Sequence, residues 1–439
     1  MRHSNITITL FLITTGIFTH ANAMDISSGG LFEGSHLDLT LRNIWMLNTT
    51  DQRADFDVGD QNAWAQAIHV DYSSGWYQDT VGFDASWYGV SKLYANKDFY
   101  GRDLLRDNNG HAEGFNKIGQ LFAKAKFGEQ KRFMNVYGGW RKLNKFGAIT
   151  TNTSRAVPST WEGLSTEIGF DQVQIKAALV NRFSERDEPE KRHFYTLKSD
   201  KKIDYIASGD ISWKPEKGKG FTYLAGDSKD YLLRQGIEGS WFWPLSENSR
   251  FLTRGVVYYN RGLSEWEGTK AFEHDAEHYF GLIGYQKAAA EFGVGWSKTK
   301  AHLKDGLGYF YWHMGKNTRG TFNSPADGEG NDYVNDGEQM LYVYSQYQVS
   351  PELLVGLYGN YGYGIEYKGV SLKEWEYGGF FSWSPQRIAG LNIFAGFGPA
   401  YTWKLDSKSN PSITDDGDSF HRAKGVGAAV RVEYKFGLF

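Results

Sequence analysis

The chain contains no cysteine among its 439 residues, which excludes disulfide bridges, thiolate metal ligands and a cysteine nucleophile. Proline is scarce at 9 residues, whereas glycine is common at 52 and aromatic residues make up 16%. Neither sign of charge dominates, because the formal net charge is −3. This near-neutral balance gives no indication of a nucleic-acid partner.

Long apolar runs are absent after the N-terminus, so no transmembrane helix is predicted, since such a helix needs about 20 apolar residues. The one apolar run, residues 6–18, follows Arg2 and His3 and precedes Ala21-Asn22-Ala23. A basic start, a short apolar core and an A-x-A site are typical of a secretory signal peptide. We therefore predict a signal peptide over residues 1–23 and a mature chain over residues 24–439 that leaves the cytoplasm.

Alternation of apolar and polar residues with a period of two fills most of the mature chain. It is clearest in residues 339–349, where Leu341, Val343 and Tyr347 share one parity, and it returns in residues 353–363. Side chains alternate across a strand, so this stretch is predicted to be a β-hairpin with one apolar face. After Leu41 the apolar parity shifts to Ile44, which indicates a bulge or a strand end.

Short turns and long connections alternate along the chain. We place eight short turns at residues 73–78, 128–131, 171–172, 214–220, 244–249, 286–287, 350–352 and 384–389. Eight hairpins, with one strand before the first and one after the last, make eighteen strands. The longest polar connections are residues 91–114, 143–159, 184–201, 300–337 and 404–421. This pattern predicts an all-β fold: a transmembrane antiparallel β-barrel of the cell outer membrane, with about 18 strands, short periplasmic turns, long extracellular loops and both termini on the periplasmic side.

Aromatic residues stand at or near every short turn. They are Tyr72, Phe127, Phe170, Trp213, Trp243, Tyr285, Tyr347 and Trp383. Amphipathic rings prefer the membrane–water interface, so these residues predict a periplasmic aromatic girdle. The chain ends in an alternating strand, residues 430–436, and stops at Phe439, a pattern that the barrel-assembly machinery is expected to recognise.

The predicted inward face carries many charges. Seven are basic and six are acidic: Arg42, Lys124, Lys126, Arg141, Lys176, Arg431, Lys435, Asp38, Asp71, Asp84, Asp204, Asp210 and Glu433. So many charges suit a water-filled lumen and not a dry core. A barrel of about eighteen strands is also too wide for side chains to fill, so we expect an aqueous channel.

The third long loop, residues 143–159, is the candidate for narrowing this channel. It is rich in Thr and Asn and contains Arg155, whose planar charged fork suits a carboxylate. The alternative is an ordinary exposed loop. The predicted constriction and solute-binding residues are Arg141, Lys142, Lys145, Arg155, Glu162, Arg42, Lys124 and Arg431.

Short motifs, taken in order, resemble the OprD-type outer-membrane porins, the substrate-specific channels that include chitoporins. The matching residues are Phe32-Glu33, Ser35, Leu37, Leu39, Leu41-Arg42-Asn43, Trp64-Ala65-Gln66, Asp71-Tyr72, Ser74-Gly75, Thr80-Val81-Gly82-Phe83, Ser154-Arg155, Pro158, Thr160, Glu162-Gly163 and Gly390-Leu391. The resemblance implies a monomeric barrel, with a weak trimer as the alternative, an inward third loop and a basic ladder along one side of the bore. Arg141 and Arg155 are the candidates for that ladder, and the long loop 300–337 departs from the family pattern.

Two classes of solute fit this channel. Neutral oligosaccharides of the chitin type are favoured, because the inward charges balance and four tyrosines would face the lumen. These tyrosines are Tyr88, Tyr342, Tyr344 and Tyr358. The alternative is a channel for carboxylates or amino acids that a row of Lys and Arg would attract.

One stretch of the chain matches an enzyme signature. Residues 274–278, His-Asp-Ala-Glu-His, match the H-x-x-E-H zinc-protease signature, but they lead into an alternating strand and no helix brings both His to one face. We therefore predict no enzyme activity and no metal or other cofactor. The remote alternative is an adhesin or receptor that acts through loop 300–337. The predicted partners are the lipid bilayer and lipopolysaccharide of the outer membrane, the barrel-assembly machinery and a small polar solute.

Overall fold

The structure is a computed structural model that describes residues 30–50, 61–96, 103–267, 271–403 and 411–439. The predicted signal peptide lies outside the described residues. Among the described residues, no helix is long and apolar enough to cross a membrane.

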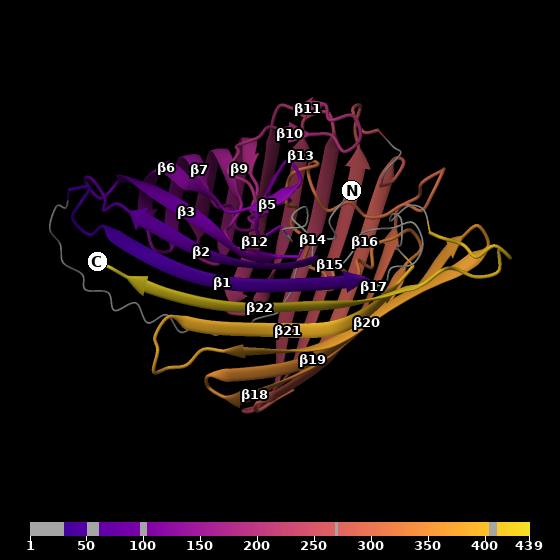
Figure 1. The fold of residues 1–439 in the computed structure, drawn as a ribbon. Helices are drawn as coiled ribbons and strands as arrows, with labels where there is room; N and C mark the ends of the chain where they lie inside the picture. The colour runs from indigo at the N-terminus through magenta and orange to yellow at the C-terminus, as the bar shows by residue number, and fades with distance from the viewer. Residues whose placement is uncertain (1–29, 51–60, 97–102, 268–270, 404–410) are drawn as a thin grey trace.

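Eighteen antiparallel strands form one closed sheet, in which β1 pairs with both β2 and β22 (Figure 1). The barrel strands are β1 (His36–Thr50), β2 (Gln61–Ser73), β3 (Val81–Ala95), β6 (Phe115–Glu129), β7 (Arg132–Arg141), β8 (Thr160–Phe170), β9 (Val173–Ser184), β12 (Ile206–Glu216), β13 (Lys219–Ser228), β14 (Leu232–Ser246), β15 (Ser249–Gly262), β16 (Asp275–Lys287), β17 (Ala290–Lys300), β18 (Gln339–Ser350), β19 (Leu353–Tyr367), β20 (Val370–Trp383), β21 (Leu391–Thr402) and β22 (Ala423–Gly437). Two small hairpins lie outside the sheet: β4 (Arg106–Asn108) with β5 (His111–Glu113), and β10 (Phe194–Tyr195) with β11 (Lys202–Ile203). The predicted all-β barrel of eighteen strands is confirmed.

Period-two alternation sets the inner and outer faces of the strands, as expected. Along β18, Leu341 and Val343 are 43% and 44% exposed on the outer face, whereas Met340 is buried inside. Six of the eight predicted girdle residues are at least 37% exposed near the short turns: Phe127, Phe170, Trp213, Trp243, Tyr347 and Trp383. The outer surface is therefore apolar, with aromatic rings at its short-turn edge.

All eight short turns lie where strand pairs end on one side of the barrel, here called the short-turn side. Seven coincide with their predicted positions, and the eighth lies at residues 288–289 because Lys287 and Ala290 still pair as strand residues. Asp171 has a φ of 51°, the left-handed conformation that a two-residue hairpin turn requires. On the opposite, long-loop side, two connections are also short, at residues 229–231 and 368–369. β1 begins and β22 ends on the short-turn side, as predicted.

The predicted break after Leu41 is wrong. The pairing of β1 with β2 runs without a register shift, from Leu41 opposite Ile68 to Ile44 opposite Ala65. Leu41 is exposed on the outside, whereas Ile44 is buried on the inside. The apolar parity changes because the inner face of the strand becomes apolar where loop residues pack against it.

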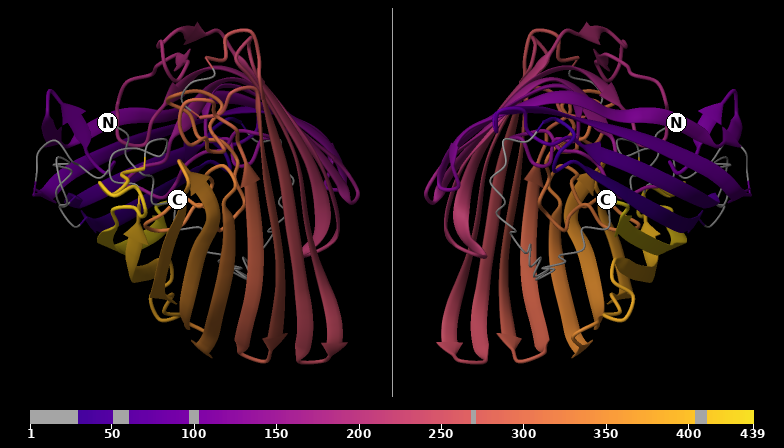
Figure 2. Two further views of the ribbon diagram at one scale, coloured as in Figure 1. Left: turned by 90° about the vertical axis from the view of Figure 1, so that its right-hand side faces the viewer. Right: turned by 90° about the vertical axis from the view of Figure 1, so that its left-hand side faces the viewer.

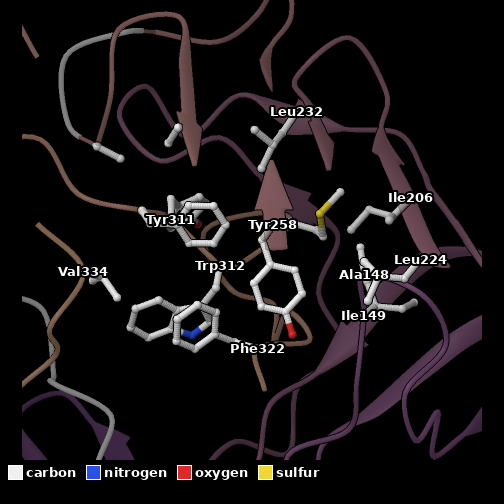
Figure 3. Close-up of a cluster of buried hydrophobic side chains, with 14 of the residues drawn as sticks. Ala148, Ile149, Ile206, Leu224, Leu232, Tyr258, Tyr311, Trp312, Phe322 and Val334 are labelled. Carbon is white, nitrogen blue, oxygen red and sulfur yellow. The ribbon is translucent and has the colours of Figure 1, made fainter. Parts of the chain in front are cut away.

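Loop residues fill the long-loop half of the barrel interior (Figure 2). A large buried cluster joins loop side chains such as Ile149, Trp312 and Phe322 to inward wall residues such as Leu224 and Tyr258. Figure 3 shows Ile149 and Ala148 beside Leu224, and Trp312 beside Phe322. The expectation of an aqueous lumen without packing therefore fails in this half, because the long loops fold inward and bring apolar side chains with them.

Candidate functional site

The loop between β7 and β8, residues 142–159, crosses the interior of the barrel. At one end Arg42 Nη1 on β1 donates to the carbonyl of Thr153 at 3.1 Å. At the other end the backbone N–H of Gly147 donates to Asp210 Oδ2 on β12 at 2.9 Å. Because β1 pairs with β2 and β22 whereas β12 pairs with β9 and β13, the two strands lie far apart around the sheet and the loop spans the lumen.

The loop between β17 and β18, residues 301–338, packs against the first loop. The N–H of Thr150 donates to the carbonyl of Arg319 at 3.2 Å, and the N–H of Thr321 donates to the carbonyl of Ala148 at 2.9 Å. Ile149 and Gly320 form the antiparallel bridge between them. The two loops thus form one body inside the barrel, here called the plug.

Between the plug and the short-turn side lies a cavity of about 800 Å³. Its lining includes Tyr342, Tyr344 and Tyr358 from the neighbouring strands β18 and β19. The rings of Tyr342 and Tyr344 stack with centroids 5.5 Å apart and planes 20° apart. These tyrosines give the cavity a flat aromatic side, as the sequence predicted for three of its four lumen tyrosines.

The carboxylates that line the cavity are used by donors of the protein itself. Glu238 accepts hydrogen bonds from the hydroxyl of Tyr258 and from Asn323 Nδ2, both at 2.6 Å. Glu291 accepts one from the hydroxyl of Tyr344 at 2.8 Å. These acids hold the wall and the plug in place.

Glu376 on β20 is the most extensively bonded of these acids. It accepts hydrogen bonds from three successive backbone N–H groups, those of Glu329, Gly330 and Asn331, at 2.9, 2.7 and 2.9 Å. Asn360 Nδ2 donates to it at 3.1 Å. The carboxylate therefore fastens the plug to the barrel wall.

Four basic residues lie in or near the cavity, and they have different partners. Lys145, Lys214 and Arg254 line the cavity, and Lys176 is close enough to influence the charge of Lys145. Lys176 Nζ donates to the carbonyl of Asn144 at 3.1 Å. Arg254 Nη2 donates to the carbonyl of Asn323 at 2.7 Å. Backbone carbonyls do not cancel a positive charge, and the carboxylates that influence these cations are Glu238, for Lys145 and Arg254, and Asp210, for Lys176.

Burial lowers the pKa of Lys145, a loop residue. Glu238 opposes this change, whereas Arg254, Lys214 and Lys176 lower the pKa further, because each adds positive charge nearby. An anion bound beside Lys145 would relieve this repulsion.

Of the eight predicted site residues, Lys145 alone belongs to the described lining of this cavity. Four others are inward or loop-end cations that pair with carboxylates: Arg42 Nε with Glu433 at 2.7 Å, Lys124 with Asp84 at 2.7 Å, Arg141 with Glu167 at 3.3 Å and Lys142 with Asp71 at 3.8 Å. Their charges are balanced within the wall of the barrel.

The remaining three are outside the described lining of the cavity for different reasons. Arg155 is fully buried, with its Nη2 3.6 Å from Asp103 Oδ2, because the chain from residue 103 folds over it. Glu162 lies next to Trp161, which is buried inside, and its carboxylate is 3.7 Å from Arg182 Nε. Arg431 is outside the described lining but near it, because its guanidinium lies over the ring of the lining residue Phe394 at 5.9 Å.

Two further residues differ from their expected places: Tyr88 faces inward but is covered by the plug, and Asp204 lies outside the strand. Tyr88 is fully buried in an apolar cluster with Ala156 and Val157 of the plug, so it does not line the cavity. Asp204 precedes the first residue of β12, is exposed and lies 3.6 Å from Lys202 Nζ. Parity identifies a face only within a strand, and it does not reveal which loop covers that face.

The H-x-x-E-H stretch lies at the start of β16, where consecutive side chains point to opposite faces. His278 is buried inside and hydrogen-bonds Thr299 and Ser324, whereas Glu277 pairs with Lys300 at 3.0 Å. Glu277 therefore cannot serve a metal held by His278.

Sequence reasoning missed Lys214, Arg254, Glu238 and Glu376. Arg254 and Glu238 have the inward parity of β15 and β14, so extending the parity analysis to those strands could have found them. No sequence signal connects Glu376 with residues 329–331, because the contact forms between a strand and a distant loop.

A closed barrel of eighteen strands with an apolar outer surface, short turns on one side and inward loops that narrow its lumen defines an outer-membrane channel. The sequence profile described as outer membrane porin, OprD family, matches residues 29–382. The chain therefore belongs to the OprD family of outer-membrane porins, which are passive channels of Gram-negative bacteria.

Solved structures of this family share the fold. Acinetobacter baumannii OccAB1 is 17% identical with a TM-score of 0.75, and 94% of this chain and 99% of that chain are covered. A BenF-like porin from Pseudomonas fluorescens Pf-5 is 18% identical with a TM-score of 0.74, over 93% of this chain and all of that chain. Pseudomonas aeruginosa OpdK, solved with vanillate, is 16% identical with a TM-score of 0.70 over the same shares. No curated protein matches the sequence.

Proposed function

We propose that the channel selects solutes that carry a carboxylate on or beside a flat ring. The supporting observation is that the acidic and the basic side chains of the cavity have different partners. Carboxylates such as Glu238 and Glu376 accept hydrogen bonds from protein donors, whereas Lys145, Lys176 and Lys214 are not held by carboxylates among the described residues. These cations can therefore receive a carboxylate of the solute.

The aromatic side of the cavity supplies the second half of the recognition. Tyr342, Tyr344 and Tyr358 line the same cavity as Lys145, so a solute held at Lys145 shares the cavity with their rings. Flat rings stack on aromatic faces with a modest gain in free energy. The OpdK structure holds vanillate, an aromatic carboxylate, which supports the same class of solute for this chain.

Oligosaccharides, which the sequence favoured, are the second candidate function. The same three tyrosines support it, since sugar rings also stack on aromatic side chains. The lining carries five basic and six acidic side chains, a balance that suits neutral solutes if the acids are available to them. The acids are engaged by the protein, and we therefore place carboxylates first.

The wider setting follows from the family and the outer surface. The lipid bilayer covers the apolar outer face of the barrel. A monomeric barrel in contact with lipopolysaccharide, assembled by machinery that recognises the last strand, remains a prediction, as does the signal peptide.

Single-channel recording in a planar bilayer tests the proposal. Benzoate, its neutral analogue benzyl alcohol and a chitooligosaccharide are added in turn to the purified protein. We expect brief current blockades with benzoate and none with benzyl alcohol. Blockades by the chitooligosaccharide without blockades by benzoate would instead establish the saccharide channel.

Two lysine variants test whether the benzoate that blocks the current binds at Lys145. Lys145→Ala should shorten the benzoate blockades roughly tenfold, the loss expected for one charge-assisted hydrogen bond. Lys435→Ala is the control, because Lys435 is an inward lysine of β22 that pairs with Glu433 at 3.3 Å. Equal effects of the two changes would contradict the assignment of the cavity.

A further inference from the structure

Three successive backbone N–H groups of the plug converge on one carboxylate. The N–H groups of Glu329, Gly330 and Asn331 all point at Glu376 on β20, at 2.7 to 2.9 Å. A run of backbone N–H groups that share one acceptor is an anion-binding concavity, or nest. Here the anion is a side chain of the protein itself.

The local sequence is suited to this close approach. In Asp327-Gly328-Glu329-Gly330-Asn331, a Cβ atom on Gly328 would lie 2.3 Å from Glu376 Oε1. A Cβ atom on Gly330 would lie 2.4 Å from the Cβ of Ala400. Glycine at both positions therefore lets the backbone reach the carboxylate and the wall.

The nest faces the cavity in which the solute is proposed to bind. Gly328, Glu329 and Glu376 belong to the lining of the cavity, together with Asn360 and Tyr358. Glu376 and Asn331 are only 2% and 4% exposed, so a carboxylate that enters this cavity reaches the donors of the nest only when the Glu376 side chain moves aside.

The plug segment has a second attachment that does not involve Glu376. Asn331 Nδ2 donates to the carbonyls of Trp375 and Tyr401 at 3.3 and 3.1 Å. If Glu376 left the nest, this amide would still tether the segment to β20 and β21. Exchange of one carboxylate for another could therefore occur without release of the whole plug.

We propose that the nest of residues 329–331 is a second carboxylate-binding site of the channel, which Glu376 occupies when no solute is bound. A solute carboxylate takes the place of the Glu376 carboxylate in the nest while the solute passes through the lumen, before or after it contacts the cations of the cavity. The inference rests on the proposed function, because it assigns the next site for the same class of solute.

Truncating the internal carboxylate tests the exchange. Glu376→Ala empties the nest, and Glu291→Ala is the matched control, because it removes an equal charge from the same cavity and leaves the nest occupied. We expect benzoate blockades to last at least about tenfold longer in Glu376→Ala than in Glu291→Ala, since the nest offers charge-assisted hydrogen bonds. Equal dwell times in the two variants would overturn the inference.

A second measurement needs no transported solute. Without its carboxylate, Glu376→Ala should show a noisier open-channel current, because the plug segment loses three hydrogen bonds. Millimolar formate should restore a quiet current in this variant and have no effect on Glu291→Ala. Noise that formate does not reduce would overturn the inference.

The experiments separate this inference from the proposed function. If benzoate blocks the wild-type channel but neither test on Glu376→Ala gives the expected result, the second binding site is overturned and the proposed solute class is kept. If benzoate never blocks the wild type but formate reduces the noise of Glu376→Ala, residues 329–331 do bind a carboxylate and the proposed solute class is overturned. Should Glu376→Ala not fold, Glu376→Gln serves instead: one acceptor oxygen remains, so intermediate dwell times support the nest and wild-type dwell times overturn it.

Discussion

The two sides of the lumen use their charges in opposite ways. On β22, β1, β3, β6, β7 and β8, here called the ion-paired side, cations such as Arg42, Lys124 and Arg141 each pair with a carboxylate. On β12 to β20, here called the cavity side, carboxylates such as Glu238 and Glu376 accept hydrogen bonds from neutral donors. An inward charge is therefore not a solute site by itself, because its partner decides whether it is available.

The physical reason lies in desolvation. A charge removed from water needs a partner, and a close opposite charge satisfies it so fully that little remains to attract a solute. A carboxylate satisfied by N–H and O–H groups keeps its net charge, but its lone pairs are occupied. The ion-paired side thus stabilises the barrel and the plug, whereas the cavity side presents aromatic rings and cations such as Lys145 and Lys214 that form no ion pair among the described residues.

The largest expected effect is a loss of stability when Arg42 is removed from the ion-paired side. This guanidinium pairs with Glu433 and also holds the plug through the carbonyls of Thr153 and Arg155. Arg42→Ala leaves a nearly buried carboxylate with only the exposed Lys435 as a partner, so we expect the free energy of unfolding to fall by about 3–5 kcal/mol. Urea unfolding followed by tryptophan fluorescence measures it.

The control for Arg42 is Lys435, whose side chain is 63% exposed and pairs with the same Glu433. Lys435→Ala should cost at most about 1 kcal/mol, because exposed pairs contribute little. A comparable loss in both variants would show that Glu433, and not the buried pair, dominates the stability of this side.

A smaller effect is expected from the aromatic rings of the cavity side. Tyr342→Ala removes one ring of the stacked pair with Tyr344. A ring stack contributes about 0.5–1.5 kcal/mol, so blockades by benzoate should become roughly three- to tenfold shorter. Tyr363, whose ring stacks on the exposed Tyr361 of β19, is the control, and Tyr363→Ala should leave the dwell times unchanged.

The smallest expected effect comes from removing the ion-pair partner of Arg141, which turns a paired cation into an unpaired one. Glu167→Gln removes the carboxylate 3.3 Å from Arg141 and keeps the shape of the side chain. One charge acting over ~7 Å of water changes the energy of an anion by about 0.6 kcal/mol, or roughly threefold. We expect benzoate blockades to become more frequent by this factor at low salt.

The salt dependence distinguishes this effect from a change of structure. The increase should fade as ionic strength rises, because screening shortens the range of the charge. An increase that persists at high salt would show that Glu167→Gln altered the shape of the lumen.

Individual residues show how far the sequence predicted this structure. Period-two alternation placed Leu341 and Val343 on the outer face and Tyr342 and Tyr344 on the inner face, because alternation is a property of every strand. The same reasoning misjudged Ile44, whose apolar side chain faces inward because loop residues cover it.

Residues of the candidate site were harder to predict than strands. Lys145 belongs to the cavity, but Arg155 of the same loop is fully buried. Both are cations in a loop expected to fold inward, and nothing local distinguishes them. The difference arises because residues from position 103 onward cover Arg155, while Lys145 faces the opening on the other side of the plug.

Alternation and local turn chemistry were enough to predict the number of strands, the short turns and the apolar outer face, because both are local properties of the chain. The family followed from short motifs in their order along the sequence. The tertiary structure alone decided which charges are available, because the pairs that remove them join residues as distant as Arg42 and Glu433. It also decided where the lumen narrows, since the plug forms from two loops, residues 142–159 and 301–338, that meet only inside the closed barrel.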